Sequence, residues 1–105
     1  MTKKMFWAVF SLLIAGLMAG SAFAAEAIKI GALLSVSGPA SFLGEPERNT
    51  AVMMVDEINK AGGVKGRKLE LVVYDTQGDA TKAVQAANKL IKDDKVVAII
   101  GDSTT

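Results

Sequence analysis

The feature that most constrains the fold is the alternation of short apolar runs with segments of helical periodicity. Ile28 to Leu34 (IKIGALL) and Val96 to Ile100 (VVAII) are almost wholly apolar, and Lys68 to Tyr74 (KLELVVY) ends in β-branched and aromatic residues. Continuous apolar runs of this length are typical of strands that are covered on both faces. The sequence therefore predicts three strands with a helix between each consecutive pair, in the order β-α-β-α-β.

The two predicted helices are amphipathic. The first is expected to begin at Glu45-Pro46-Glu47, because a proline and two acids suit the first turn of a helix. The second is expected to begin after Asp79, which caps it. Residues at i, i+3, i+4 and i+7 lie on one face of a helix, and this spacing predicts two apolar faces: Ala51, Met54, Val55 and Ile58 in the first helix, and Ala83, Val84, Ala87, Leu90 and Ile91 in the second.

Strands that alternate with helices of this length imply right-handed crossovers and a parallel sheet, so the predicted class is α/β. Ligands of such sheets bind beyond the carboxyl ends of the strands. Any binding site is therefore expected in the loops 35–44, 75–78 and 101–105. The last predicted strand has no covering helix after it, which would leave an apolar sheet edge exposed. We interpret the chain as a fragment.

Residues 1–24 are predicted to be a secretory signal peptide. A basic start precedes the apolar run Met5 to Met18, and Ala22 and Ala24 supply small residues at the positions that a signal peptidase reads. The alternative is a transmembrane anchor, since the uncharged stretch reaches the ~20 residues that a bilayer span needs. The glycines and alanines of its second half favour cleavage, after Ala24. The exported mature domain would be residues 25–105.

Composition excludes several function classes. The chain has no Cys and no His, which rules out disulfides, Cys/His zinc sites, Cys nucleophiles and His-based triads. Its net charge of +1 does not indicate the basic surface that a nucleic-acid partner would require. Gly38 to Gly44 is followed by two acids and a proline, which disfavour a phosphate. We expect no metal, no cofactor and no enzymatic activity, although a secreted α/β enzyme that uses Asp75 remains an alternative.

Hydroxyl side chains are concentrated in two of the expected strand-end loops. The first loop contains Ser35, Ser37 and Ser41, and the last contains Ser103, Thr104 and Thr105. Hydroxyls and free backbone N–H groups can hold a carboxylate without a counter-charge, and Phe42 and Leu43 could form an apolar wall. The alternative is a plain surface loop, and composition alone leaves both interpretations open.

Three segments of the chain resemble the start of a known family. They are AIKIGALLSVSGPASFLG, MMVDEINKAGGVKGRKLELVVYDTQGDATKAV and KVVAIIGDSTT. Their order and spacing resemble the leucine/isoleucine/valine-binding family of periplasmic proteins, which are solute receptors of ABC importers. The resemblance covers essentially all of residues 28–105, and its most specific pieces are Ser37-Gly38-Pro39, Ala61-Gly62-Gly63-Val64 and Val97 to Gly101.

The resemblance implies a type I periplasmic binding protein fold, of which this chain supplies an incomplete first lobe. A second lobe and a hinge would complete the ligand cleft. It further implies a periplasmic protein that binds a small molecule, most simply a branched-chain amino acid, and delivers it to an ABC permease. The family also takes amides, urea and aromatic acids, and a ligand-sensing ectodomain of a membrane signalling protein is the alternative function.

Two sets of ligand-binding residues follow from the same resemblance. Leu43 lies where the family places a side chain, often aromatic, against the apolar part of the ligand. Thr105 or Thr104 is expected to donate the direct hydrogen bond to the ligand carboxylate, with Ser103 behind them. No cofactor is implied.

Overall fold

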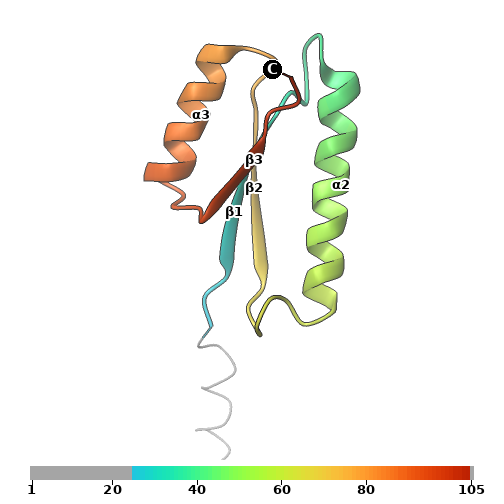
Figure 1. Cartoon of the computed structure of the whole chain (residues 1–105), viewed down its shortest axis with the longest axis vertical. Coiled ribbons are helices and arrows are strands. Elements are labelled where there is room, and N and C mark those ends of the chain that lie inside the picture. Colours follow the sequence, from blue (N-terminus) through green and yellow to red (C-terminus); the bar gives the residue numbers. More distant parts are fainter. Residues whose placement is uncertain (1–24, 105) are drawn as a thin grey trace, which may run out of the picture.

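The computed structural model describes residues 25–104 and shows a small α/β unit (Figure 1). The predicted signal peptide, with Ala22 and Ala24, lies outside the described residues, and so does Thr105. The elements follow the predicted order: β1 (Ile28–Leu34), α2 (Ser41–Lys60), β2 (Leu69–Asp75), α3 (Ala80–Lys92) and β3 (Ala98–Gly101).

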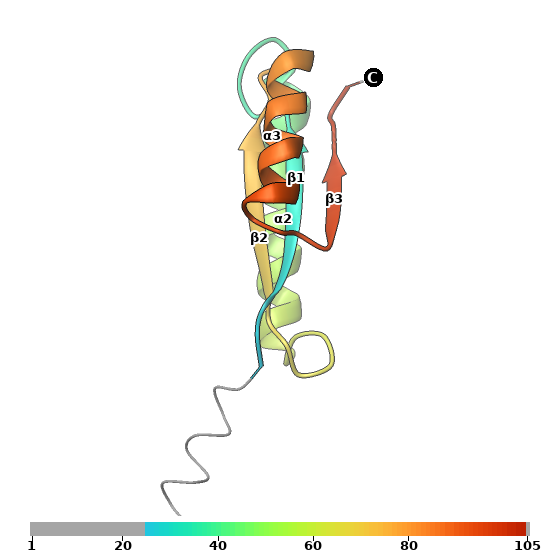
Figure 2. The same ribbon diagram turned by 90° about the vertical axis from the view of Figure 1, so that its left-hand side faces the viewer.

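The three strands form one parallel sheet in the order β2-β1-β3. In this register Leu34 lies opposite Asp75 on one side of β1, and Leu33 lies opposite Gly101 on the other. The views in Figures 1 and 2 place α2 and α3 on opposite faces of the sheet. The predicted α/β class with a parallel sheet is confirmed, and the carboxyl ends of all three strands lie at the same edge.

The predicted strand boundaries are correct for β1 and shifted for the other two. β2 begins and ends one residue later than predicted, and β3 covers Ala98–Gly101 rather than residues 96–100. The backbone N–H of Val96 is bonded to Leu90 in α3, so this residue still belongs to the helix exit. Val97 then donates to Lys29, and the regular pairing with β1 begins after it.

The predicted start of α2 is wrong by four residues. The helix begins at Ser41, so Pro46 is an interior residue rather than a first-turn residue. The N–H groups of Leu43 and Gly44 both donate to Ala40, which closes the first turn ahead of the proline. Proline costs the helix one i→i−4 bond, but close to the N-terminus that loss does not break it. The loop after β1 is therefore limited to residues 35–40.

The core is small and is centred on β1. Ala32 and Leu34 of β1 and Leu90 of α3 are fully or almost fully buried. An added Cβ on Gly31 would meet Leu90 at 2.8 Å, which shows how closely α3 approaches the strand. The predicted cap of α3 is confirmed, since the side chain of Asp79 accepts from the N–H of Lys82 at 2.8 Å.

Three residues of the predicted apolar helix faces are exposed instead of buried. Met54 of α2 is 46% exposed, and Val84 and Ile91 of α3 are 62% and 58% exposed. Val84 and Ile91 lie on the flank of α3 opposite Lys89, which lies over the Tyr74 ring of β2. The exposed flank of α3 therefore lies towards β3, which is the edge strand of the sheet among the described residues.

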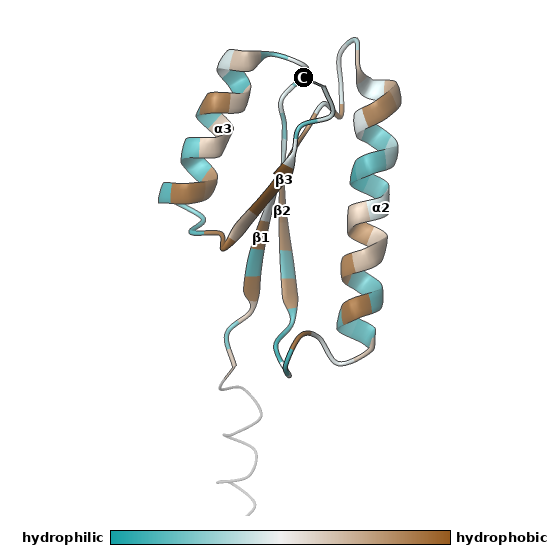
Figure 3. Ribbon diagram, in the orientation of Figure 1, coloured by the Kyte–Doolittle hydropathy of each residue, from teal (hydrophilic) through white to brown (hydrophobic). Residues whose placement is uncertain are grey.

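β3 itself is apolar and uncovered. Ile99 is 39% exposed and Ile100 is 51% exposed, although they point to opposite faces of the sheet. Figure 3 shows this strand as a hydrophobic stripe between the two helices. The expected exposed apolar edge is thus present in the structure. Across residues 25–104, neither helix combines the length and apolarity needed to cross a membrane.

Candidate functional site

The candidate site lies at the edge where the three strands end. The first residues beyond β1, β2 and β3 are Ser35, Thr76 and Asp102. Because the strands are parallel and in register, these residues converge. Ser35 and Thr76 are completely buried, whereas Asp102 is exposed.

The Asp102 carboxylate bonds to both buried hydroxyls. The Thr76 hydroxyl donates to its Oδ2 at 2.8 Å and the Ser35 hydroxyl donates to its Oδ1 at 3.2 Å. The two hydroxyl oxygens are 3.2 Å apart. Hydrogen bonds to an ionised acceptor are stronger than neutral ones, so this triangle ties the three strand ends together.

Ser103 connects the same triangle to α2. Its hydroxyl donates to Glu47 Oε2 at 2.5 Å and accepts from the N–H of Ser35 at 3.1 Å. A serine hydroxyl has one proton, so in this arrangement the donor of Ser103 is already used. Ser103 therefore supports the segment that follows β3, and the hydroxyls beyond it remain the candidates for direct contact with a ligand.

Asp75, at the end of β2, orders the loop that follows β1. Its carboxylate accepts from the Ser37 hydroxyl at 2.5 Å, from the Ser37 N–H at 3.1 Å and from the Gln77 N–H at 3.0 Å. Desolvation raises the pKa of Asp75, but the hydrogen bonds from Ser37 and Gln77 together outweigh it and bring the pKa below its ordinary value. Asp75 thus acts as a loop anchor, which fits its expected turn role.

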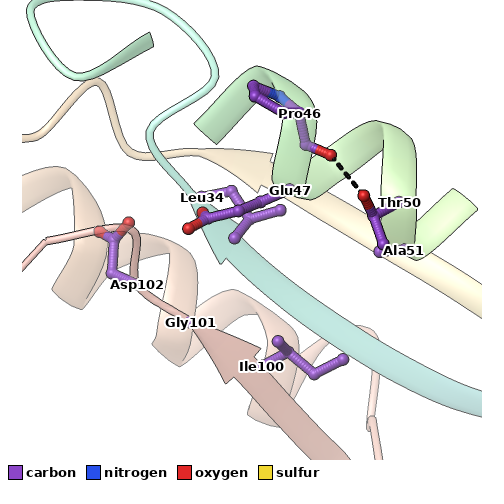
Figure 4. Close-up of a pocket in the computed structure, with 8 residues that line it drawn as sticks. All are labelled: Leu34, Pro46, Glu47, Thr50, Ala51, Ile100, Gly101 and Asp102. Carbon is purple, nitrogen blue, oxygen red and sulfur yellow. Dashed lines mark hydrogen bonds between the residues drawn. The ribbon is translucent and has the colours of Figure 1, made fainter. Parts of the chain in front are cut away.

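A cavity of about 620 Å³ opens between the first turns of α2 and the end of β3 (Figure 4). Its apolar lining comes from three elements: β1 supplies Leu34, α2 supplies Pro46 and Ala51, and β3 supplies Ile100. Its polar lining comprises Thr50, Glu47 and Asp102, and Thr50 donates to the Pro46 carbonyl at 2.8 Å. The cavity can accept an aliphatic group, while its two carboxylates disfavour an anion at that point.

Gly101 is required where β3 enters the site. Its φ of +144° lies in the region that favours glycine. An added Cβ would also meet the Leu33 carbonyl oxygen at 2.2 Å. No larger residue fits here without moving β3 away from β1.

The predicted ligand-binding residues are divided between two places. Phe42 and Leu43 lie in the first turn of α2 and are 73% and 38% exposed, and neither lines the cavity. Ser103 lies at the strand ends and is half-buried, and exposed Thr104 follows it. Ser103 and Thr104 thus directly follow Asp102 at the polar edge of the cavity, whereas Phe42 and Leu43 precede the first cavity-lining residue of α2, Pro46.

Thr76, Asp102 and Glu47 were not among the predicted binding residues. A signal for the first two was available in the sequence, since each is the second residue beyond the end of a predicted strand. The contact between Glu47 and Ser103 could not be predicted, because it depends on α2 beginning at Ser41. Among the described residues no three acidic side chains group in the way a metal site requires.

Comparisons with known families and sequences identify relatives over nearly the whole described chain. The family described as periplasmic binding protein matches residues 27–105. A Pseudomonas aeruginosa protein named leucine-, isoleucine-, valine-, threonine-, and alanine-binding protein is 43% identical over 83 residues, which are 79% of this chain and 22% of the relative. The Escherichia coli K12 Leu/Ile/Val-binding protein is 42% identical over 69 residues, or 66% of this chain and 19% of the relative.

Solved structures agree with the sequence comparisons. The branched-chain amino acid transporter substrate binding protein of Streptococcus pneumoniae, solved in complex with isoleucine, superposes with a TM-score of 0.70 at 36% identity over 71% of this chain and 22% of that one. An extracellular ligand-binding receptor from Rhodopseudomonas palustris HaA2 gives 0.66 at 37% identity over 75% and 20%. The chain thus spans about a fifth of the length of these relatives.

Proposed function

Because the chain belongs to the leucine/isoleucine/valine-binding family of periplasmic binding proteins, we propose that the complete encoded protein is the solute receptor of an ABC importer. Its ligand would be a branched-chain or related amino acid, bound where the strand ends meet. The protein would bind and release this ligand without a chemical step and would deliver it to a membrane permease.

The observation that carries the proposal is the convergence of β1, β2 and β3 beside an apolar cavity. Leu34, Ala51 and Ile100 offer an aliphatic surface to a ligand side chain. Ser103 is bonded to the Glu47 and Asp102 carboxylates, and the hydroxyl and backbone donors that follow it are available to a ligand carboxylate. An amino acid with an aliphatic side chain matches both surfaces.

A second lobe would be needed for tight binding. A ligand that touches both lobes binds the closed form better than the open form, and only this difference in affinity can drive closure. The described residues form part of one lobe, so we expect residues 25–105 alone to bind the ligand weakly or not at all.

Thermal unfolding of the complete encoded protein tests the ligand class. We expect L-leucine, L-isoleucine or L-valine to raise the melting temperature, because a ligand at about one hundred times its Kd stabilises the folded state by about 2.7 kcal/mol. Amides, urea and L-phenylalanine test the other ligands of the family, and D-leucine is the stereochemical control. Absence of a shift with every amino acid would refute the proposed ligand class.

Three variants test the proposed contacts separately. Thr104→Val removes a hydroxyl with little change in shape, and Thr105→Val does the same one residue later. We expect one of them to weaken the binding of all amino acid ligands, while Leu43→Ala weakens leucine binding more than alanine binding. Equal affinities in all three variants and the wild type would place the ligand elsewhere.

Export to the periplasm is the last part of the proposal. The basic start, the apolar run and the pair Ala22 and Ala24 support cleavage after Ala24. N-terminal sequencing of the periplasmic product is expected to begin at Ala25, and Ala24→Leu should leave the leader attached. A membrane-bound product that retains residues 1–24 in the wild type would instead indicate an anchor.

A further inference from the structure

The Asp102 carboxylate is a shared hydrogen-bond acceptor at the strand ends. It accepts from the hydroxyls of Ser35 and Thr76 and from the N–H of Ser103. The donors come from the ends of all three strands. Its position on the polar edge of the cavity puts the same carboxylate next to the segment proposed to hold the ligand.

The ionised carboxylate fixes the direction of every hydrogen bond around it. A carboxylate can only accept, so the protons of Ser35 and Thr76 both point towards Asp102. The Ser103 hydroxyl is fixed from its other side, because it accepts from the Ser35 N–H and donates to Glu47. The network therefore has one consistent orientation, and it ends at the residue that precedes Thr104.

β3 needs such a connection more than the other strands. It is four residues long, it pairs with β1 alone among the described strands, and all of its residues are exposed. At its carboxyl end Gly101 pairs with Leu33 of β1, and no described strand lies on the other side of β3. Asp102 joins that end to the buried hydroxyls of the two longer strands.

We propose that Asp102 is a positioning residue for ligand binding: its carboxylate holds the three strand ends together and thereby sets the conformation of the Ser103–Thr104 segment. The expected effect of Asp102 on ligand affinity rests on the proposed function. Its effect on the backbone of Ser103 is independent of any ligand. Thr76 donates a hydrogen bond to the same carboxylate, and its side chain does not line the cavity.

The test compares amide exchange and affinity in variants of the complete encoded protein. In Asp102→Ala we expect exchange at the Ser103 N–H to accelerate at least about tenfold and the affinity for L-leucine to fall by about tenfold or more, since hydrogen bonds to a charged group are lost. Asp102→Asn keeps one acceptor oxygen and should recover part of both losses. Asp56→Ala, which removes a carboxylate from an exposed ion pair with Lys60, is the matched control and should change neither quantity.

Thr76→Val separates positioning from direct contact with the ligand. The variant is close to isosteric and removes one partner of Asp102, so positioning predicts a weaker affinity and faster exchange at Ser103. In the double variant Asp102→Ala/Thr76→Val the two losses of affinity should not add, because both substitutions remove the same hydrogen bond between Thr76 and Asp102. If Asp102→Ala weakens binding while Thr76→Val and exchange at Ser103 are unchanged, Asp102 touches the ligand itself and the proposal is wrong.

Two further outcomes are decisive. Unchanged affinity in Asp102→Ala would also overturn the proposal, and if that variant does not fold, Asp102→Asn and Thr76→Val give the same comparison. A wild-type protein that binds none of the amino acids would refute the proposed function, and exchange at Ser103 would still decide whether Asp102 holds the strand ends.

Discussion

At the scale of single residues, Asp75 illustrates how a loop anchor makes folding sensitive to pH. Three hydrogen bonds from Ser37 and Gln77 favour its ionised form in the folded protein. Its pKa is therefore lower in the folded state than its ordinary value of 3.8. A carboxyl group with a lowered folded-state pKa stabilises the protein above its unfolded pKa, and this contribution is lost as the pH falls through the folded pKa.

Replacing Asp75 with asparagine should remove this pH dependence. We expect Asp75→Asn to unfold at a lower urea concentration than the wild type at pH 7, with the difference shrinking as the pH falls below about 4. Asp93→Asn removes the same charge at an exposed position and controls for net charge. A difference between Asp75→Asn and wild type that is constant from pH 7 to pH 3 would contradict this role of Asp75.

At the scale of elements, the approach of α2 to the end of β1 depends on Gly44. It is the only buried residue of α2, and an added Cβ would lie 2.0 Å from the Ser35 carbonyl oxygen. Backbone atoms of the strand cannot move aside as a flexible side chain can, so the first turn of α2 would have to shift. The position of Glu47, one turn later, would shift with it.

Gly44→Ala should therefore destabilise the complete encoded protein by more than about 1 kcal/mol, although alanine is the better helix former. The measurement is equilibrium urea unfolding. Gly62→Ala is the comparison that separates two causes: Gly62 has a φ of +107° and nothing within 4 Å of the added Cβ, so its loss of stability would come from backbone strain, whereas that of Gly44→Ala would come from the steric contact. A Gly44→Ala variant as stable as wild type would show that α2 is not closely packed on the strand end.

The elements also show which parts of the fold could be predicted from sequence. β1 was predicted to the residue because its apolar run ends at a segment rich in Ser, Gly and Pro, and the Asp79 cap was predicted from local chemistry. The start of α2 was not predicted, because Pro46 is a first-turn residue by local preference and tertiary packing at Gly44 extends the helix ahead of it. Local signals are overridden where two elements come into close contact.

At the scale of the whole molecule, the sequence predicts where a candidate site would lie more directly than it predicts which side chains would form it. Parallel topology placed it at the carboxyl ends of the strands, and the structure brings those ends together. The individual contacts of Asp102 and Glu47 depend on register and on the first turn of α2, which periodicity does not resolve. Val97, Ile99 and Ile100 are exposed along the β3 edge of the sheet, so an element packed against this edge would extend the core.

The most direct test of the account is a crystal structure of the complete encoded protein with L-leucine bound. We expect the ligand to lie beyond the carboxyl ends of β1 and β3, with its carboxylate hydrogen-bonded to the Ser103–Thr105 segment and its side chain against apolar residues of the first lobe. A ligand bound away from these strand ends, or one whose carboxylate contacts none of those three residues, would contradict it.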